Sequence, residues 1–127
     1  MIRLSLLVLS IFSLIYGVYF LFFPSNFVNI TAAEETNIAW LRNTGASITG
    51  LLFIGLLYIY INPEKSLKLL TIITITSIIQ TSALIYSRLF NEFSAKKIFL
   101  IDLTIYSALI VTIYLVFITI KYKKVFN

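Results

Sequence analysis

The chain alternates between long apolar runs and short polar breaks. Four runs contain almost only apolar residues, and they cover residues 4–23, 38–61, 67–90 and 98–120. Each run has about the 20 residues of α-helix that cross a hydrocarbon core about 30 Å thick. The runs are apolar on all sides, which excludes the amphipathic helices of a water-soluble core. The pattern predicts an all-α polytopic membrane protein, an antiparallel bundle of four transmembrane helices in a single domain over residues 1–127.

Turn-forming residues separate the runs. Proline or asparagine follows the first three, at Pro24, Asn62 and Asn91, and lysines follow the fourth. These residues disfavour continued helix. The connection at 24–37 is the only one long enough for a short interfacial helix, and we expect it to cover the outer end of the bundle. We expect the second long helix to begin within two residues of Asn37.

Composition supports a membrane location and removes many chemistries. Of 127 residues, 60% are hydrophobic and only 12% are charged, and the mean hydropathy is +1.00. So few charges cannot cover the surface of a small soluble domain, and they exclude a disordered chain or a nucleic-acid-binding domain. The chain has no Cys and no His, which removes thiol chemistry, histidine bases and nearly every zinc or haem site. We expect no metal, no cofactor and no catalytic residue.

Basic residues are concentrated on one side of the predicted bundle. Because the helices alternate in direction, both termini and the connection at 62–66 lie on the same side. The basic residues there are Arg3, Lys65, Lys68, Lys121, Lys123 and Lys124. With Glu64 as its single acid, this side has a net charge of +5. The opposite side has a net charge of zero, because its basic and acidic residues are equal in number. The positive-inside rule predicts that both termini are cytoplasmic, and the same surface attracts anionic lipid at the cytoplasmic face.

Three charged residues lie inside the apolar runs. Arg42 and Asp102 each lie four residues into a run, and Arg88 lies two residues before the end of one. The alternating helices bring all three to the same outer level of the membrane. A charge in hydrocarbon is costly unless it is paired, so we expect an Arg42–Asp102–Arg88 cluster at the outer mouth of the bundle. The polar residues expected around it are Gln80, Asn43, Glu34 and Glu35. Alternatively, the arginines reach the outer headgroups separately.

The cluster has two interpretations, and both remain open. Two guanidinium groups suit a carboxylate or a phosphate headgroup, which makes the cluster a candidate anion site. The other interpretation is an ion pair that fixes the register of the helices.

Small and hydroxylated residues follow the charges into the membrane. Ser77, Thr81 and Arg88 share one face of the third helix, because they are spaced by four and seven residues. Such residues let membrane helices approach closely and form hydrogen bonds, so we interpret this face as a packing surface. A stripe of small side chains in the second helix is interpreted as a packing seam, and it consists of Ala39, Asn43, Ala46 and Gly50.

These motifs resemble an uncharacterised, DoxX-like family of small bacterial four-helix membrane proteins. The shared pattern is a proline after helix one, an arginine with small residues and glycine in helix two, an arginine ending helix three and an acid in helix four. The matching segments here are Phe23-Pro24, Leu41-Arg42-Asn43-Thr44-Gly45, Ser87-Arg88 and Asp102. The resemblance covers nearly the whole chain and implies the four-helix fold and the charged cluster, without an activity.

We expect a small non-catalytic integral membrane protein, an accessory or structural component of a larger membrane assembly or a homo-oligomer. The alternative is a binding protein or transporter for a small or lipidic anion that uses Arg42, Arg88 and Asp102. A membrane enzyme acting on lipid or isoprenoid would have only Asp102 as an intramembrane base. Isoleucine is abundant (22 residues) and alanine scarce (7), a bias typical of AT-rich bacterial genomes. We therefore expect a multi-pass protein of the bacterial inner (cytoplasmic) membrane.

Overall fold

The computed structural model describes residues 1–34 and 37–126, and in this part of the chain it contains helices and no strand. Its elements are α1 (Ile2–Phe22), α2 (Pro24–Thr31), α3 (Asn37–Ser47), η1 (Ile48–Ile54), α4 (Gly55–Ile61), η2 (Pro63–Lys65), α5 (Leu67–Leu89) and α6 (Ile98–Phe126). Four helices are long and apolar enough to cross a membrane, with α3, η1 and α4 together forming the second. The predicted all-α fold with four long helices is confirmed.

The second long helix contains a π-helical segment, η1, between its two α-helical parts. The flanking residues Ser47 (φ −64°, ψ −43°) and Gly55 (φ −61°, ψ −47°) keep right-handed helical angles, so the helix is continuous. A π-turn is wider than an α-turn and is usually inserted as a single turn inside an α-helix. The sequence pattern predicts an uninterrupted α-helix here, and the structure corrects it.

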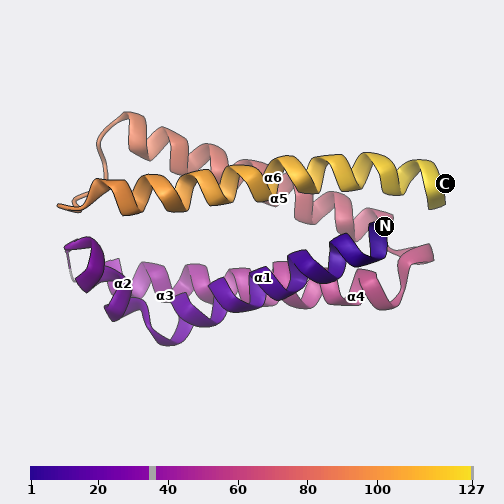
Figure 1. Cartoon of the computed structure of the whole chain (residues 1–127), viewed down its shortest axis with the longest axis horizontal. Helices are drawn as coiled ribbons and strands as arrows, with labels where there is room; N and C mark the ends of the chain where they lie inside the picture. The colour runs from indigo at the N-terminus through magenta and orange to yellow at the C-terminus, as the bar shows by residue number, and fades with distance from the viewer. Residues whose placement is uncertain (35–36, 127) are drawn as a thin grey trace.

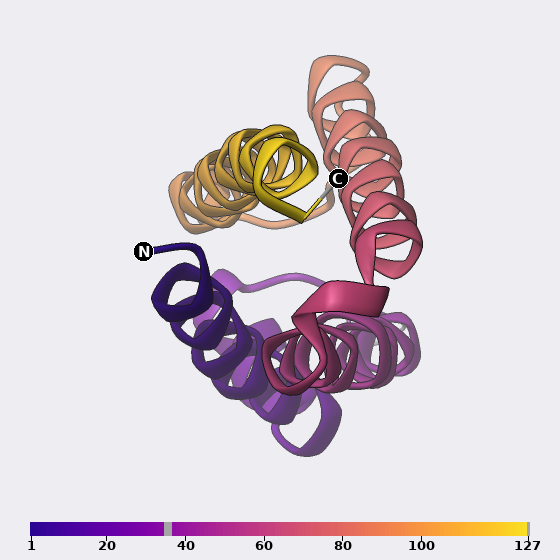
Figure 2. The same cartoon turned by 90° about the vertical axis from the view of Figure 1, so that its right-hand side faces the viewer.

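The long helices form two pairs. Helix α1 packs along α3, η1 and α4, and α5 packs along α6. Figure 1 shows the pairs as two layers, and Figure 2 shows the four helices from the end that carries both termini. Contacts of α1 with α6 and of α4 with α5 join the two pairs into one bundle.

The hydrophobic core lies toward the end that carries the termini. Each long helix contributes a fully buried side chain to one cluster, and these include Leu6, Ile59, Ile73 and Leu115, all 0% exposed. Lipid tails are as apolar as these side chains. In a bilayer, close van der Waals packing therefore holds such a cluster together more than removal from water does.

Glycine permits the closest approach between α1 and α3. A Cβ at Gly45 would meet the backbone of α1 at the Phe20 carbonyl carbon and the Gly17 oxygen, at 2.7 and 2.8 Å. The stripe interpreted from the sequence as a packing seam lies elsewhere on this helix. Its members are exposed, and Gly50 has no neighbour within 4 Å of a Cβ built there. The seam therefore does not pack against another helix of this chain.

Helix α2 covers the end of the bundle opposite the termini and joins the two pairs. Pro24 begins it at a position that needs no backbone donor, and Val28 is buried at 2% exposure. After its end, the amides of Lys96 and Lys97 donate to the carbonyl oxygens of Ala32 and Thr31, at 3.3 and 3.0 Å. The connection holds a short helix and covers this end of the bundle as expected, and α3 begins at Asn37 as expected.

Two helix ends differ from the apolar runs. Helix α1 begins at Ile2, and α6 continues through the lysines after residue 120 to Phe126. Lysines end an apolar run without ending a helix, because cations are favourable in the last turn. Tyr122 also anchors this segment, because its side chain is fully buried in the core cluster. Four residues later, the centroid of the Phe126 ring lies 4.6 Å from that of the Tyr122 ring.

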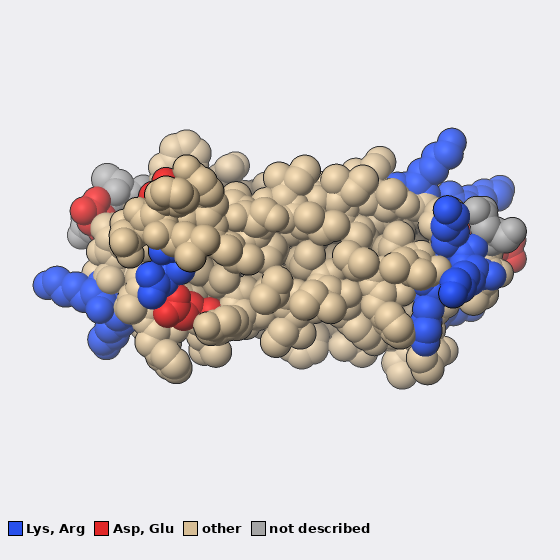
Figure 3. Space-filling model, turned by 90° about the horizontal axis from the view of Figure 1, so that it is seen from above, with Lys and Arg blue, Asp and Glu red and all other residues tan. Residues whose placement is uncertain are grey.

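Charged side chains gather toward the two ends of the molecule, and an uncharged band lies between them on the face in Figure 3. The end that carries both termini is mainly basic in this view. This distribution is the one expected when the uncharged band lies in the hydrocarbon and the two ends lie at the headgroups.

Candidate polar site at the outer end

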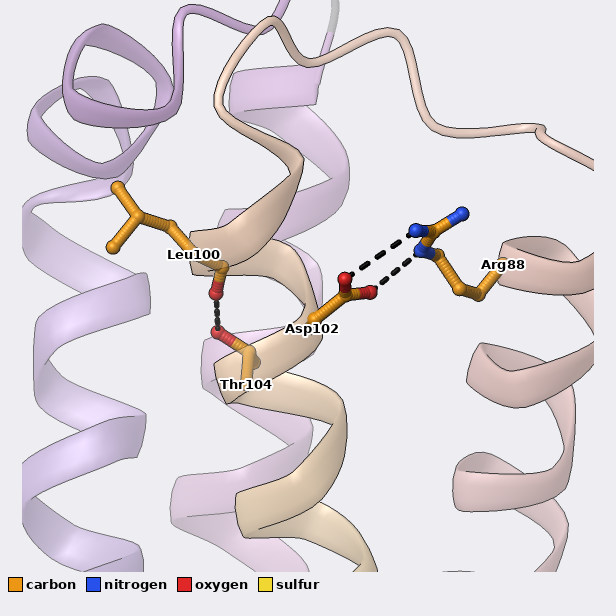
Figure 4. Close-up of polar contacts among 4 residues, drawn as sticks. All are labelled: Arg88, Leu100, Asp102 and Thr104. Atoms are coloured by element: carbon orange, nitrogen blue, oxygen red, sulfur yellow. Dashed lines mark hydrogen bonds and ion pairs between the residues drawn. The ribbon is translucent and has the colours of Figure 1, made fainter.

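Arg88 and Asp102 form an ion pair between α5 and α6. The Arg88 Nε donates to Asp102 Oδ1 at 2.5 Å, and Nη2 donates to Oδ2 at 3.3 Å. Figure 4 shows the two side chains pointing toward each other from neighbouring helices, while Leu100 points away on the other side of α6. The two-point contact matches the planar guanidinium to the planar carboxylate, which fixes orientation as well as distance.

The local sequence places both groups at helix ends. Arg88 lies in the last turn of α5, where a cation complements the negative end of the helix dipole. The chain leaves α5 through Asn91, which has a left-handed φ of 53°, and returns within seven residues to start α6. This short return makes α5 and α6 antiparallel neighbours, so Asp102 in the second turn of α6 lies level with Arg88.

The pair is only partly covered, with side chains 35% and 29% exposed. The two charges cancel each other. Each carboxylate oxygen accepts one hydrogen bond from the guanidinium, and three of its five N–H donors are left for other partners. The arrangement fixes two helices relative to each other, and it presents no nucleophile next to a base.

Arg42 does not join this pair. It is exposed on α3, which belongs to the other helix pair, and it makes no hydrogen bond or ion pair with any residue that the structure describes. The expected three-residue cluster is therefore reduced to two members. The depth of Arg42 follows from its position along the helix, but its direction depends on how α3 packs against α1, and here the Arg42 side chain is exposed.

The polar residues expected around the cluster are also elsewhere. Gln80, Asn43 and Glu34 are exposed, and among the described residues their side chains bond to neither Arg88 nor Asp102. Gln80 precedes Arg88 by eight residues, which is about 12 Å along a helix and too far to reach it. Asn43 lies on α3 and Glu34 follows α2, both outside the α5–α6 pair. Glu35 lies outside the described residues.

A chain of buried hydroxyl groups joins α5 to α6 below the ion pair. Thr112 on α6 shares hydrogen bonds with Ser77 at 2.7 Å and with Thr81 at 2.8 Å. One level deeper, Thr74 and Thr119 bond at 2.7 Å. The interpretation of Ser77 and Thr81 as packing residues is confirmed. The two α6 partners were not singled out from the sequence, although their spacing of seven residues places Thr112 and Thr119 on one face.

In the described ranges, no three side chains of the metal-binding types gather into one site. Comparisons with protein-family models, with curated proteins and with solved structures find no match to this chain. The site opposite the termini is an ion pair that joins α5 to α6, next to a ladder of hydroxyl groups between the same two helices.

Proposed function

We propose that this chain is a small non-catalytic component of a larger membrane assembly, in the bacterial inner membrane with both termini cytoplasmic. The observation that carries the proposal is a polar surface on the second long helix that no other part of the described chain covers. We call this surface the α3 polar face, and it consists of Asn43, Ser47 and Gly50, with Arg42 on the adjacent side of the same helix.

The α3 polar face extends from the outer end toward the middle of the membrane. Asn43 lies about 9 Å and Gly50 about 20 Å along the helix from Asn37. All three members are exposed. The Ser47 hydroxyl donates back to the Asn43 carbonyl oxygen at 3.2 Å, and the Asn43 side chain bonds to none of the described residues. Polar side chains facing lipid lack partners, so such faces normally meet another helix.

Small residues on this face would let that helix approach closely. Ala46 and Gly50 are four residues apart and both exposed, which is the small-xxx-small spacing of membrane helix contacts. Gly50 has open space where a side chain would be. The face therefore combines a close-approach surface with donors and acceptors that lipid cannot satisfy.

The orientation rests on charge. The end that carries the termini and η2 holds the six basic residues that give it a net +5, and basic residues favour the cytoplasm. The DoxX-like motifs support the same small four-helix class.

The proposal is tested by co-purification in a mild detergent with identification of partners by mass spectrometry. We expect the wild type to carry a second copy or another membrane protein, and Gly50→Leu to lose it. The matched control is Ala83→Leu, which enlarges an exposed small residue on α5 and should keep the partner. A wild-type protein that purifies as a lone monomer would overturn the proposal.

The alternative, an anion-binding protein or transporter, has less support from the geometry. Asp102 already occupies two donors of Arg88, and Arg42 belongs to the other helix pair. The two guanidinium groups do not converge on one ligand, so this alternative would depend on Arg42 alone.

A further inference from the structure

A polar pocket lies at the opposite end of the bundle, beside the termini. It has a volume of about 260 Å³, and it is lined by Arg3, Ile61, Asn62, Pro63, Glu64 and Lys65. Pockets for drug-sized ligands have about 300–1,000 Å³, so this one fits a headgroup-sized molecule. Helix α1 supplies Arg3, and the end of α4 with η2 supplies the other residues.

Charges of both signs line the pocket without neutralising one another. In the part of the chain that the structure describes, the single ion pair is Arg88–Asp102 at the other end. The side-chain nitrogens of Arg3 and Lys65 therefore lie more than 4 Å from the carboxylate oxygens of Glu64, although all three residues line the same pocket. Two cations and one anion held apart around a space match a ligand that carries a negative and a positive group of its own.

We propose that the pocket binds a phospholipid headgroup that carries both a phosphate and a primary ammonium. The phosphate lies at Arg3 and Lys65, whose N–H groups suit phosphate oxygens, and the ammonium donates to Glu64. The exposed apolar side chain of Ile61 faces the start of the acyl chains, and this end of the bundle lies at headgroup level when the four helices span the bilayer.

The test uses the full-length protein in detergent, titrated with phosphatidylethanolamine, phosphatidylglycerol and phosphatidylcholine of the same acyl chains, with binding measured by native mass spectrometry. We expect phosphatidylethanolamine to bind about tenfold more tightly than the other two, the difference typical of one hydrogen bond to a charged group. Soluble glycerophosphoethanolamine should compete only weakly if the ligand is a lipid, and equally well if it is a free phosphate ester.

Two variants test the ammonium contact and the phosphate contact separately. Glu64→Gln should remove the preference for phosphatidylethanolamine over phosphatidylcholine and leave phosphatidylglycerol binding unchanged. Arg3→Gln should weaken the binding of all three lipids without lowering the unfolding temperature of the lipid-free protein. The matched control is Lys124→Gln, which removes a charge at the same end outside the pocket.

Two results would overturn the proposal. One is equal binding of the three lipids by the wild type. The other is a loss in Lys124→Gln as large as in Arg3→Gln, which would show a diffuse charged surface in place of a site. Both outcomes are independent of whether a protein partner co-purifies through the α3 polar face.

Discussion

Gly45 lies so close to Phe20 that a Cβ on the glycine would be 2.7 Å from the phenylalanine carbonyl carbon. Real Cβ atoms essentially never approach backbone atoms so closely, and backbone cannot move aside as a flexible side chain can. The crossing of α3 and α1 therefore requires glycine at this position. Gly50, on the same long helix, has open space in the corresponding direction, so the two glycines form a matched pair.

We predict that Gly45→Ala destabilises the bundle and that Gly50→Ala does not. The added methyl group forces the helices apart, and such overpacking costs about 1–3 kcal/mol. At Gly50 the methyl group meets nothing in this chain, and alanine favours helix over glycine. Unfolding of both variants in mixed micelles, followed by circular dichroism, measures the difference. Equal losses in the two variants would contradict the close crossing.

For the ion pair between α5 and α6, we predict coupling between Arg88 and Asp102. Each single alanine variant should lower the midpoint of thermal unfolding in detergent, because it leaves the opposite charge without its partner. Arg42 lies on the other helix pair, so it should not replace Arg88. The double variant should then lose less than the two single losses added together.

The control for this cycle is Glu92→Ala, an exposed carboxylate that makes no ion pair with the described residues. It should leave the midpoint unchanged, and Asp102→Asn should fall between the wild type and Asp102→Ala because the amide still accepts a hydrogen bond. Additive losses from Arg88→Ala and Asp102→Ala would show that the two side chains do not act as a pair.

A third prediction concerns the hydroxyl ladder. Thr112→Val keeps the side-chain shape but removes the oxygen that links Ser77 and Thr81. The loss should be about 1 kcal/mol, the net value of a hydrogen bond in proteins and in the range measured between membrane helices. Thr104→Val is the control, because its hydroxyl bonds only to Leu100 of its own helix. A larger effect at Thr104 than at Thr112 would argue against the ladder.

The fourth prediction concerns orientation. A reporter that is active only in the cytoplasm should be active when fused after Asn127 and inactive when inserted within residues 28–36. The +5 charge of the end that carries the termini is the physical reason. Activity at both fusion sites would reject the four-span topology with cytoplasmic termini.

The number of long helices and the approximate positions of most of their ends could be predicted because they depend on local properties. An apolar run of about 20 residues is long enough to span the hydrocarbon, and Pro24 begins a new helix where the run ends. Asn91 takes the left-handed angle that ends a helix. The pairing of Arg88 with Asp102 also has a local basis, since a short connection places their helices side by side.

The direction in which each side chain points could not be predicted. In a water-soluble helix the apolar stripe marks the buried face, but here the lipid-facing and the core-facing sides are both apolar. The depth of Arg42 is therefore readable from the sequence, and its rotation about the helix axis is not. The π-helical segment η1 could not be predicted for a similar reason. The sequence of Ile48–Ile54 is mostly apolar, like the rest of the run, and nothing in it distinguishes a π-helix from an α-helix.

The π-helical segment η1 gives the second long helix one residue more than an α-helix over the same path would contain. In η1 the hydrogen bonds span five residues where an α-helix spans four, so an α-helical path between Gly45 and Gly55 would be one residue shorter. Deleting a residue elsewhere in a spanning helix rotates everything beyond it by about 100° and would turn its buried side to lipid. A deletion within 48–54 is expected to convert η1 to α-helix while Gly45 stays against α1 and Gly55 against Ile73. This short segment is where the chain can change its length without changing which faces meet.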